Sequence, residues 1–157
     1  MRLGIITGAE NSGADADHVA EESSKFPFEE YDYIIDAIDT VTAKIDLVLQ
    51  AERFQIPIIS SMGTGNKLDP TRLEVSDIYK TSVCPLAKVM RRELKKRDIK
   101  KLKVVYSTEE AMIPIAGLIP ESEDKPRKAT PGSNAFVPAT AGLLIGSEVV
   151  KDLIKIV

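Results

Sequence analysis

The sequence lacks several features on which whole classes of protein depend. Tryptophan is absent and aromatic residues make up only 5% of the 157 residues, so aliphatic side chains must form most of the core. No apolar run approaches the roughly twenty residues that a membrane-spanning helix needs, which excludes such a helix. Residues 1–6 carry one cation and a short apolar run, a pattern unlike that of a secretory signal peptide.

Cysteine and histidine are nearly absent too. Cys84 is the single cysteine, so no internal disulfide can form, and this is typical of a reducing compartment. We therefore expect a cytoplasmic protein. His18 is the single histidine and has no partner at metal-ligand spacing, so we interpret it as a surface residue.

Hydrophobic residues are 43% and charged residues 29% of the chain, the mix of one ordinary globular domain. The net charge of −3 conceals an asymmetry, because residues 1–40 hold ten acidic and two basic residues. Nine basic residues crowd into 88–103 instead. Such a cluster suits a polyanionic partner, although a solvated helix face has the same pattern.

The apolar pattern alternates between strands and helices. Strands are predicted at 3–7, 33–39, 56–60, 73–79 and 102–106, and helices at 40–54, 85–97 and from 138 to the end. A short helix is expected at 15–24, and the proline-rich residues 108–134 are expected to be a long loop. A strand, a helix and a strand within about 30 residues predict a parallel crossover unit, and hence an α/β fold.

The sharpest local signal is a pair of carboxylates at the end of the second strand, Asp36 and Asp39. In open parallel sheets, ligands bind outside the carboxyl ends of the strands. A carboxylate there can hold Mg²⁺ beside nucleotide phosphates, because hard cations prefer oxygen ligands. The alternative is that Asp39 merely caps the helix that follows, since Asp is a favoured N-cap residue.

Residues 31–44, YDYIIDAIDTVTAK, resemble the D-x-x-D segment of the ThiF/HesA/MoeB-type adenylating enzymes, relatives of the ubiquitin-activating enzymes. Within that family they are most similar to the tRNA threonylcarbamoyladenosine dehydratases. Further segments agree in the same order and bring the resemblance to about two-thirds of the chain. These segments are 56–71, 77–81, 85–94, 104–109 and 132–154.

The resemblance implies a partial Rossmann-like sheet in three layers, with flanking helices, in which 31–157 is the C-terminal half of a ThiF-type protein. It also implies ATP-dependent adenylation of a carboxylate, most specifically in the cyclodehydration of threonylcarbamoyladenosine in tRNA. ATP and Mg²⁺ are then the expected cofactors. The family's D-x-x-D residues correspond to Asp36 and Asp39, with Asp39 beside the metal, and Lys44 falls where relatives carry Arg or Lys.

The chain departs from the family before residue 31. The G-x-G-G-x-G phosphate loop, with the first βαβ unit to which it belongs, has no counterpart in 1–30, which we interpret as an atypical acidic leader. We therefore expect that this chain alone is inactive. Two alternatives stay open: a non-catalytic dimerising or tRNA-binding remnant, and an adenylyltransferase for a sulfur-carrier protein.

Other residues acquire candidate roles from the resemblance. Cys84 is a weak candidate for a thioester-forming nucleophile, and an ordinary small residue near a helix start is the alternative. One cysteine cannot form the four-thiolate structural zinc site of some sulfur-transfer relatives, so no structural zinc is expected. Homodimers are expected, with residues 135–145 as an interface or a core helix. Candidates for binding tRNA phosphates are Lys88, Arg91, Arg92, Lys95 and Lys96.

Overall fold

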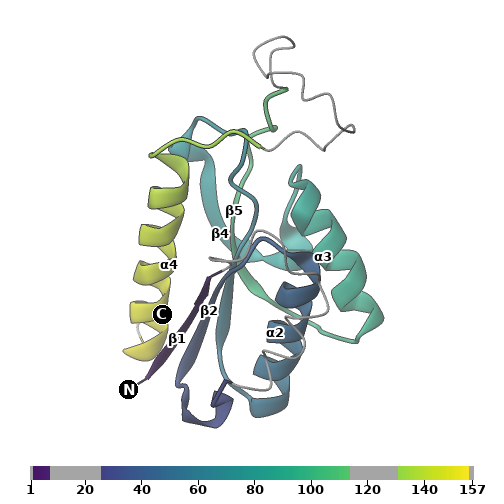
Figure 1. Cartoon of the computed structure of the whole chain (residues 1–157), viewed down its shortest axis with the longest axis vertical. Coiled ribbons are helices and arrows are strands. Elements are labelled where there is room, and N and C mark those ends of the chain that lie inside the picture. Colours follow the sequence, from purple (N-terminus) through teal and green to yellow (C-terminus); the bar gives the residue numbers. More distant parts are fainter. Residues whose placement is uncertain (1, 8–25, 114–130, 156–157) are drawn as a thin grey trace, which may run out of the picture.

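A single five-stranded sheet organises the chain, with helices on both of its faces (Figure 1). The structure is a computed structural model that describes residues 2–7, 26–113 and 131–155. The strands are β1 (Leu3–Thr7), β2 (Tyr33–Ala37), β3 (Ile58–Ser61), β4 (Leu73–Asp77) and β5 (Lys103–Ser107). The helices of the described part are α2 (Val41–Phe54), α3 (Pro85–Lys96) and α4 (Val137–Leu153), with short 3-10 turns at Phe28–Glu30, Pro70–Arg72 and Ile78–Lys80.

The strands lie in the order β1-β2-β3-β5-β4, and the first four of these are parallel to one another. The predicted crossover unit is β2-α2-β3 and is confirmed. The predicted extended segment at 73–79 is a strand only as far as Asp77, and it runs antiparallel to β5. The sheet is therefore mixed, with one antiparallel strand at its edge.

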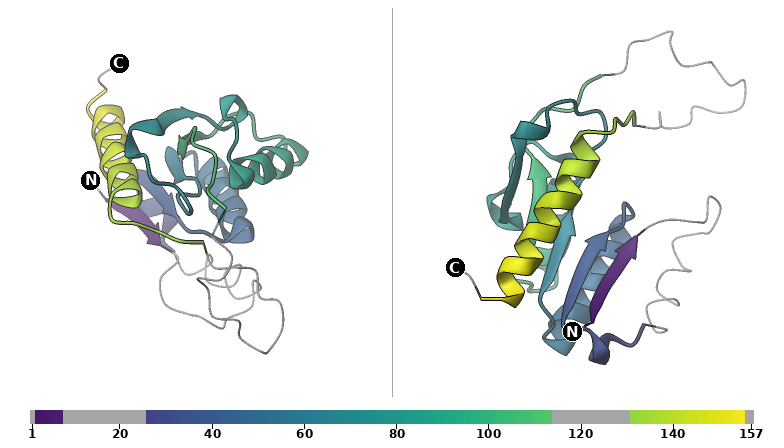
Figure 2. Two further views of the ribbon diagram at one scale, coloured as in Figure 1. Left: turned by 90° about the horizontal axis from the view of Figure 1, so that it is seen from above. Right: turned by 90° about the vertical axis from the view of Figure 1, so that its left-hand side faces the viewer.

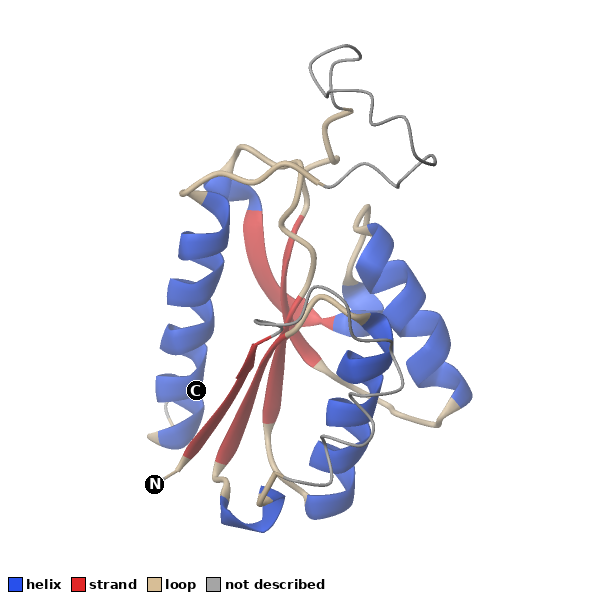
Figure 3. Cartoon of the chain, viewed as in Figure 1, coloured by secondary structure: helices blue, strands red, loops and turns tan. Residues whose placement is uncertain are grey.

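Alternate residues of β5 pack on opposite faces, as the two-residue period of a strand requires. Val104 and Tyr106 join the cluster under α2 and α3, whereas Val105 joins the cluster under α4. Figure 2 shows α4 on one face of the sheet and α2 on the other. The predicted three-layer α/β class is thus confirmed, and Figure 3 shows the strands between the helices, with loops joining them.

The helix ends follow from local sequence. Gln55 takes a left-handed conformation with φ of 55°, and its N–H bonds back to the last turn of α2, which ends the helix before Pro57. Pro85 begins α3, since it lacks the N–H that a first turn leaves unpaired. Before α4, the side chain of Asn134 accepts hydrogen bonds from the N–H groups of Phe136 and Val137, at 2.8 and 2.9 Å.

The expected leader contributes a strand to the sheet. β1 pairs with β2 in parallel register, Gly4 beside Ile34 and Ile6 beside Asp36. In the order of classical dinucleotide-binding sheets, the first strand lies beside the fourth. β1 occupies that place next to β2, so residues 2–7 are part of the fold rather than an appendage.

Two expectations fall on residues outside the described part, namely the helix at 15–24 and the middle of the loop at 108–134. Among the helices that the structure does describe, none combines the length and the apolar character needed to cross a bilayer.

Candidate functional site

Asp39 lies at the carboxyl end of the parallel strands, as predicted. β2 ends at Ala37 and α2 begins at Val41, so Asp39 occupies the short turn between them and its side chain is exposed. In this kind of sheet the turn after a strand faces the crevice where ligands bind. Asp39 is thus the accessible member of the predicted carboxylate pair.

Asp36 and Lys44 form an ion pair in the interior, directly beneath that turn. Both side chains are fully buried, and Lys44 Nζ lies 3.0 Å from Asp36 Oδ2. Lys44 Nζ also donates to Ser60 Oγ at 3.2 Å and to the carbonyl oxygen of Ser61 at 2.7 Å. Ser60 Oγ donates to Asp36 Oδ2 as well. Every strong polar group of this network therefore has a partner within it, as buried charges require.

The network fixes the shape of the turn that carries Asp39. Asp36 Oδ1 accepts the N–H of Ile38 at 3.1 Å, so the carboxylate folds the chain back immediately after β2. Lys44, in the first turn of α2, joins the same carboxylate to the end of β3. Asp36 and Lys44 were predicted to contact the nucleotide. In the structure both side chains are fully buried beneath the turn that carries Asp39.

Burial strongly influences the charge state of Lys44. Loss of solvation lowers the pKa of Lys44, while the nearby carboxylate of Asp36 acts in the opposite direction. Asp39 also acts electrostatically on Lys44, which places its negative charge close to the buried pair. The charge of Lys44 is thus maintained by acidic neighbours rather than by water.

The capping interpretation of Asp39 does not fit the helix start. The N-cap of α2 is Thr40, and no side-chain hydrogen bond caps the helix. Among the residues that the structure describes, no hydrogen-bond partner is found for the Asp39 carboxylate. The first turn of α2 is held instead by the Lys44 side chain, so Asp39 has no structural role that the fold reveals.

Three further loops meet at the same edge of the sheet. Asn66, after β3, has a positive φ of 57°; its backbone N–H donates to Gly132 O at 2.8 Å, and its side chain accepts the Gly132 N–H at 2.6 Å. Glu109, after β5, accepts the N–H groups of Leu68 and Asp69, both at 3.0 Å. Those backbone N–H groups lower the pKa of Glu109.

These contacts join the segments after β3, after β5 and before α4 into one wall. The roles of Asn66 and Glu109 escaped the reasoning from single residues, although both lie in segments that carry the family resemblance. Their position after strand ends was the available signal.

Cys84 is buried, with 2% of its surface exposed, and belongs to the core cluster under α3. It precedes Pro85 and serves as the N-cap residue of α3 without a side-chain hydrogen bond. A thioester-forming nucleophile needs access to a carbonyl carbon, which this position does not offer. The position fits the alternative of a small core residue.

The five candidate tRNA-binding residues differ in availability. Arg91 is turned inward and donates to the carbonyl oxygen of Thr81 at 2.9 Å. Arg92 and Lys96 contact the Glu93 carboxylate at 3.1 and 2.9 Å, and Arg97 contacts it as well. Hydrogen bonds from Lys96, Arg97 and Arg92 lower the pKa of Glu93 to about 2, so it stays ionised and offsets part of the cluster.

The two remaining cations point away from such partners. Across the described ranges, the side chains of Lys88 and Lys95 are exposed and have no ion-pair or hydrogen-bond partner. Lys88 lies in the first turn of α3, near Leu86, whose side chain approaches Gly63 in the loop after β3. Lys88 is therefore at the end of α3 that lies nearer the loop after β3.

A mostly parallel sheet with helices on both faces and an exposed acid at its carboxyl edge defines a Rossmann-like α/β protein. No family model matches the chain. The chain is nevertheless 47% identical over 130 residues to the tRNA threonylcarbamoyladenosine dehydratase of Bacillus subtilis strain 168, across 79% of this chain and 51% of that protein. It is 40% identical over 92 residues to the Escherichia coli K12 protein of the same name, across 54% of this chain and 34% of that protein.

Solved structures agree with the sequence relatives. The E. coli tRNA N6-threonylcarbamoyladenosine dehydratase in complex with AMP matches 88% of this chain and 53% of its own, with a TM-score of 0.66 and 31% identity. The same protein in complex with ATP matches with a TM-score of 0.66 and 30% identity. The resemblance to ThiF-type adenylating enzymes is confirmed, and the chain spans about half the length of these relatives.

The carboxyl edge offers few oxygen ligands for a divalent cation. Within 2–7, 26–113 and 131–155, no group of three or more His, Cys, Asp or Glu side chains converges to form a metal site. Mg²⁺ in nucleotide sites is commonly held by one or two carboxylates together with phosphate oxygens. The single exposed carboxylate of Asp39 fits a site in which nucleotide phosphates supply most of the oxygen ligands.

We predict that Lys44→Met destabilises the fold by about 3–5 kcal/mol, because it leaves the Asp36 carboxylate buried without its counter-ion. The double variant Asp36→Asn with Lys44→Met should lose less than the sum of the two single variants, since it removes both charges. Urea unfolding followed by circular dichroism would measure all four proteins. Near-neutral single variants would contradict the buried ion pair of Asp36 and Lys44.

Proposed function

We propose that this chain forms part of an ATP-dependent enzyme that activates the carboxylate of threonylcarbamoyladenosine in tRNA by adenylation. The proposal depends chiefly on one observation: Asp39 stands exposed at the carboxyl edge of the sheet, held by a buried ion pair, within a chain similar to threonylcarbamoyladenosine dehydratases. We expect the protein to act in the cytoplasm on the modified tRNA.

The chemistry of adenylation explains what such a site supplies. A free carboxylate is a poor electrophile because hydroxide is a poor leaving group. In the proposed reaction a carboxylate oxygen attacks the α-phosphorus of ATP and pyrophosphate leaves. A nucleophile within the same substrate then attacks the acyl carbon, AMP leaves, and the ring closes with net loss of water.

Asp39 has the role of metal ligand in this proposal. Mg²⁺ bound there would screen the charge of the nucleotide phosphates. Asp36 and Lys44 position the turn from below. The glycine loop that normally receives the phosphates has no recognised counterpart in this sequence. The nucleotide pocket therefore needs residues besides Asp36, Asp39 and Lys44.

We predict that Asp39→Asn lowers the rate of ATP–pyrophosphate exchange at least about a hundredfold, since it removes an anionic ligand from the site of charge development. The melting temperature should change little, because the Asp39 side chain is exposed and caps no helix. Exchange would be measured with threonylcarbamoyladenosine tRNA, and with the part of the B. subtilis relative that lies outside the matched residues supplied as a second chain.

Asp98→Asn is the matched control for this charge removal. Asp98 is exposed, has a φ of 62° that Asn tolerates, and lies in the turn between α3 and β5. Its variant should retain full exchange. An Asp39→Asn protein that exchanges at the wild-type rate would exclude the metal role. A wild-type complex without exchange would contradict the adenylating function and favour a non-catalytic tRNA-binding module.

We further propose that tRNA phosphates contact α3 through its unpaired cations. Lys88 and Lys95 can each neutralise a phosphate without first breaking an existing contact, whereas Arg91, Arg92 and Lys96 already have protein partners. Phosphate contacts of this kind release counterions and make binding depend strongly on salt.

The double variant Lys88→Ala with Lys95→Ala should therefore weaken tRNA binding, and the slope of log affinity against log salt should fall by about two. Arg91→Ala should change the slope much less, because its guanidinium faces Thr81. Filter binding over a series of salt concentrations would measure both. Equal slopes in wild type and the double variant would favour the alternative that the α3 cations form a solvated face without a tRNA contact.

We propose that the expected homodimer forms through the outer face of α4. Its inner residues Val137, Ala141 and Ile145 are buried against the sheet. The opposite side exposes Phe136, Leu143, Val150 and Ile154, at 68%, 75%, 54% and 58%. A Cβ added at Gly142 or Gly146 would meet no atom within 4 Å, so a second helix has room to approach. Exposed apolar side chains that share one helix face favour association.

We expect Leu143→Glu to convert a dimer to a monomer in sedimentation velocity experiments, because it places a charge at the centre of that face. The melting temperature of the monomer should stay close to that of wild type, since the Leu143 side chain makes little contact within one chain. Lys95→Glu on α3 is the control and should remain dimeric. A wild-type protein that sediments as a monomer would contradict this interface.

A further inference from the structure

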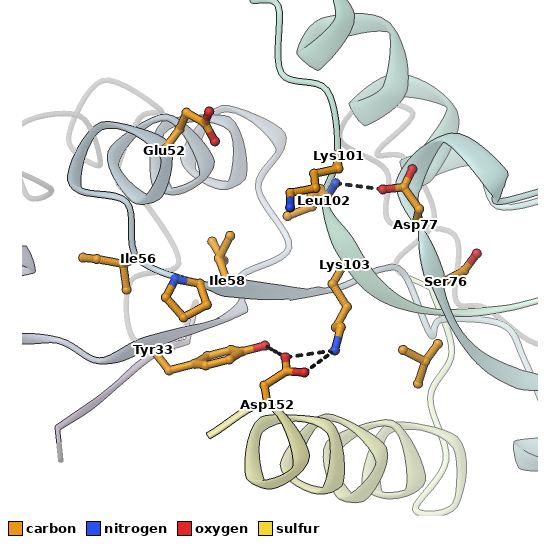
Figure 4. A pocket seen from close by; sticks show the side chains of 12 residues that line it. Tyr33, Glu52, Ile56, Ile58, Ser76, Asp77, Lys101, Leu102, Lys103 and Asp152 are labelled. Carbon is orange, nitrogen blue, oxygen red and sulfur yellow. Dashed lines mark hydrogen bonds and ion pairs between the residues drawn. The ribbon is translucent and has the colours of Figure 1, made fainter. Parts of the chain in front are cut away.

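A pocket of about 530 Å³ lies at the edge of the sheet opposite Asp39 (Figure 4). Tyr33, Ile58 and Lys103 begin β2, β3 and β5, so the pocket lies at the amino ends of the parallel strands. Asp77 reaches it from the end of the antiparallel β4, and Asp152 from the last turn of α4. The adenylation proposal uses none of these residues.

One part of the lining is apolar. Ile56, Pro57, Ile58 and Val75 contribute aliphatic surface, and three of them lie at or just before the start of β3. A pocket of this size, with mostly apolar walls and a few polar groups, is typical of small-molecule sites. The apolar wall favours a ligand with an aliphatic portion.

The inner polar wall is already satisfied within the protein. Lys103 Nζ lies 2.7 and 2.9 Å from the two Asp152 oxygens and 3.2 Å from Glu148 Oε2. The Tyr33 hydroxyl donates to Asp152 Oδ2 at 2.6 Å. Burial, followed by that hydrogen bond, raises the pKa of Tyr33, so the hydroxyl stays protonated and keeps donating. This wall is a fixed boundary rather than a set of free binding groups.

Asp77 is likewise occupied. Its two oxygens accept the N–H groups of Tyr79 and Leu102, at 2.8 and 3.2 Å. Figure 4 shows Asp77 beside Leu102, on the far side of the pocket from Tyr33. Asp77 therefore shapes the end of β4 and is not an open anionic ligand.

Two charges of opposite sign remain available. Glu52, at the end of α2, and Lys101, before β5, are both exposed, and within the described residues their side chains have no ion-pair or hydrogen-bond partner. Figure 4 shows them along one side of the pocket, with Tyr33, Asp152 and Lys103 along the opposite side. Ser76 adds a hydroxyl without a hydrogen-bond partner in the same part of the chain.

We propose that this pocket binds a small zwitterion of the amino-acid class with an aliphatic side chain. Lys101 binds its carboxylate and Glu52 its ammonium group, while the side chain packs on Ile58 and Val75. A ligand with only one charge would leave either Lys101 or Glu52 without a partner. Electrostatic complementarity of this kind selects among ligands more than it adds affinity.

The test compares three ligands with the same branched carbon skeleton: L-leucine, isocaproate, which lacks the amine, and isoamylamine, which lacks the carboxylate. Titration of the ¹⁵N-labelled 157-residue chain by NMR would report both affinity and location. We expect leucine to bind with a millimolar dissociation constant and to shift the amide signals of Ile58, Ser76 and Leu102. Isocaproate and isoamylamine should each bind about fivefold more weakly, as the loss of one exposed ion pair implies.

Variants separate the two charges. Lys101→Met should weaken leucine and isocaproate about fivefold and leave isoamylamine unchanged, whereas Glu52→Gln should weaken leucine and isoamylamine and leave isocaproate unchanged. Both side chains are exposed, so the fold is retained. Lys80→Met and Glu110→Gln, which lie outside the pocket, are the controls and should bind like wild type.

Three outcomes would overturn the proposal. The first is the absence of any shift at the pocket amides, and the second is equal affinity for all three ligands. The third is tighter binding of isocaproate or isoamylamine than of leucine, which would assign the pocket to a simple anion or a simple cation. None of these depends on whether the chain adenylates tRNA.

Discussion

The buried pair of Asp36 and Lys44 is the constraint on which the carboxyl edge of the sheet depends. One carboxylate accepts the Ile38 N–H, the Lys44 ammonium and the Ser60 hydroxyl, and so joins β2, α2 and β3 at a single point. Because these charges have no access to water, either one alone would be strongly destabilising. The turn that carries Asp39 therefore depends on the Asp36–Lys44 ion pair, in which neither residue can be replaced alone without a large loss of stability.

The parallel strands give this small fold two distinct edges. Their carboxyl ends converge on Asp39 and on the loops fixed by Asn66 and Glu109. Their amino ends, with the end of α4, form the pocket lined by Tyr33 and Asp152. The helices cover the two faces and leave both edges open. The length of the strands thus separates the Asp39 turn from the pocket. A residue substituted at the carboxyl ends of the strands makes no contact with the pocket at their amino ends.

Much of this arrangement followed from residue patterns. Periodicity located all five strands and the three described helices, because amphipathic segments of ordinary length dominate the chain. It did not reveal the direction of β4, since pairing partners are set by tertiary contacts. The position of Asp39 followed from its place after a strand, and its role at a metal stays a prediction. Sequence spacing could not show that the Lys44 side chain turns inward to Asp36. Charge counting on α3 likewise could not show that Arg91 contacts Thr81 and that Glu93 contacts Lys96.

Charge balance at the carboxyl edge explains why the proposed chemistry requires a metal. Lys44 offsets Asp36 within the interior, so the exposed charge of Asp39 is left as the net charge of the group. An isolated carboxylate repels the phosphates of a nucleotide, and among the described residues no ion pair is recorded for Asp39. A divalent ion reverses that repulsion, because it binds carboxylate and phosphate oxygens together. Because the Lys44 ammonium is buried against Asp36, it leaves the negative charge of Asp39 uncancelled and so available for the proposed ion.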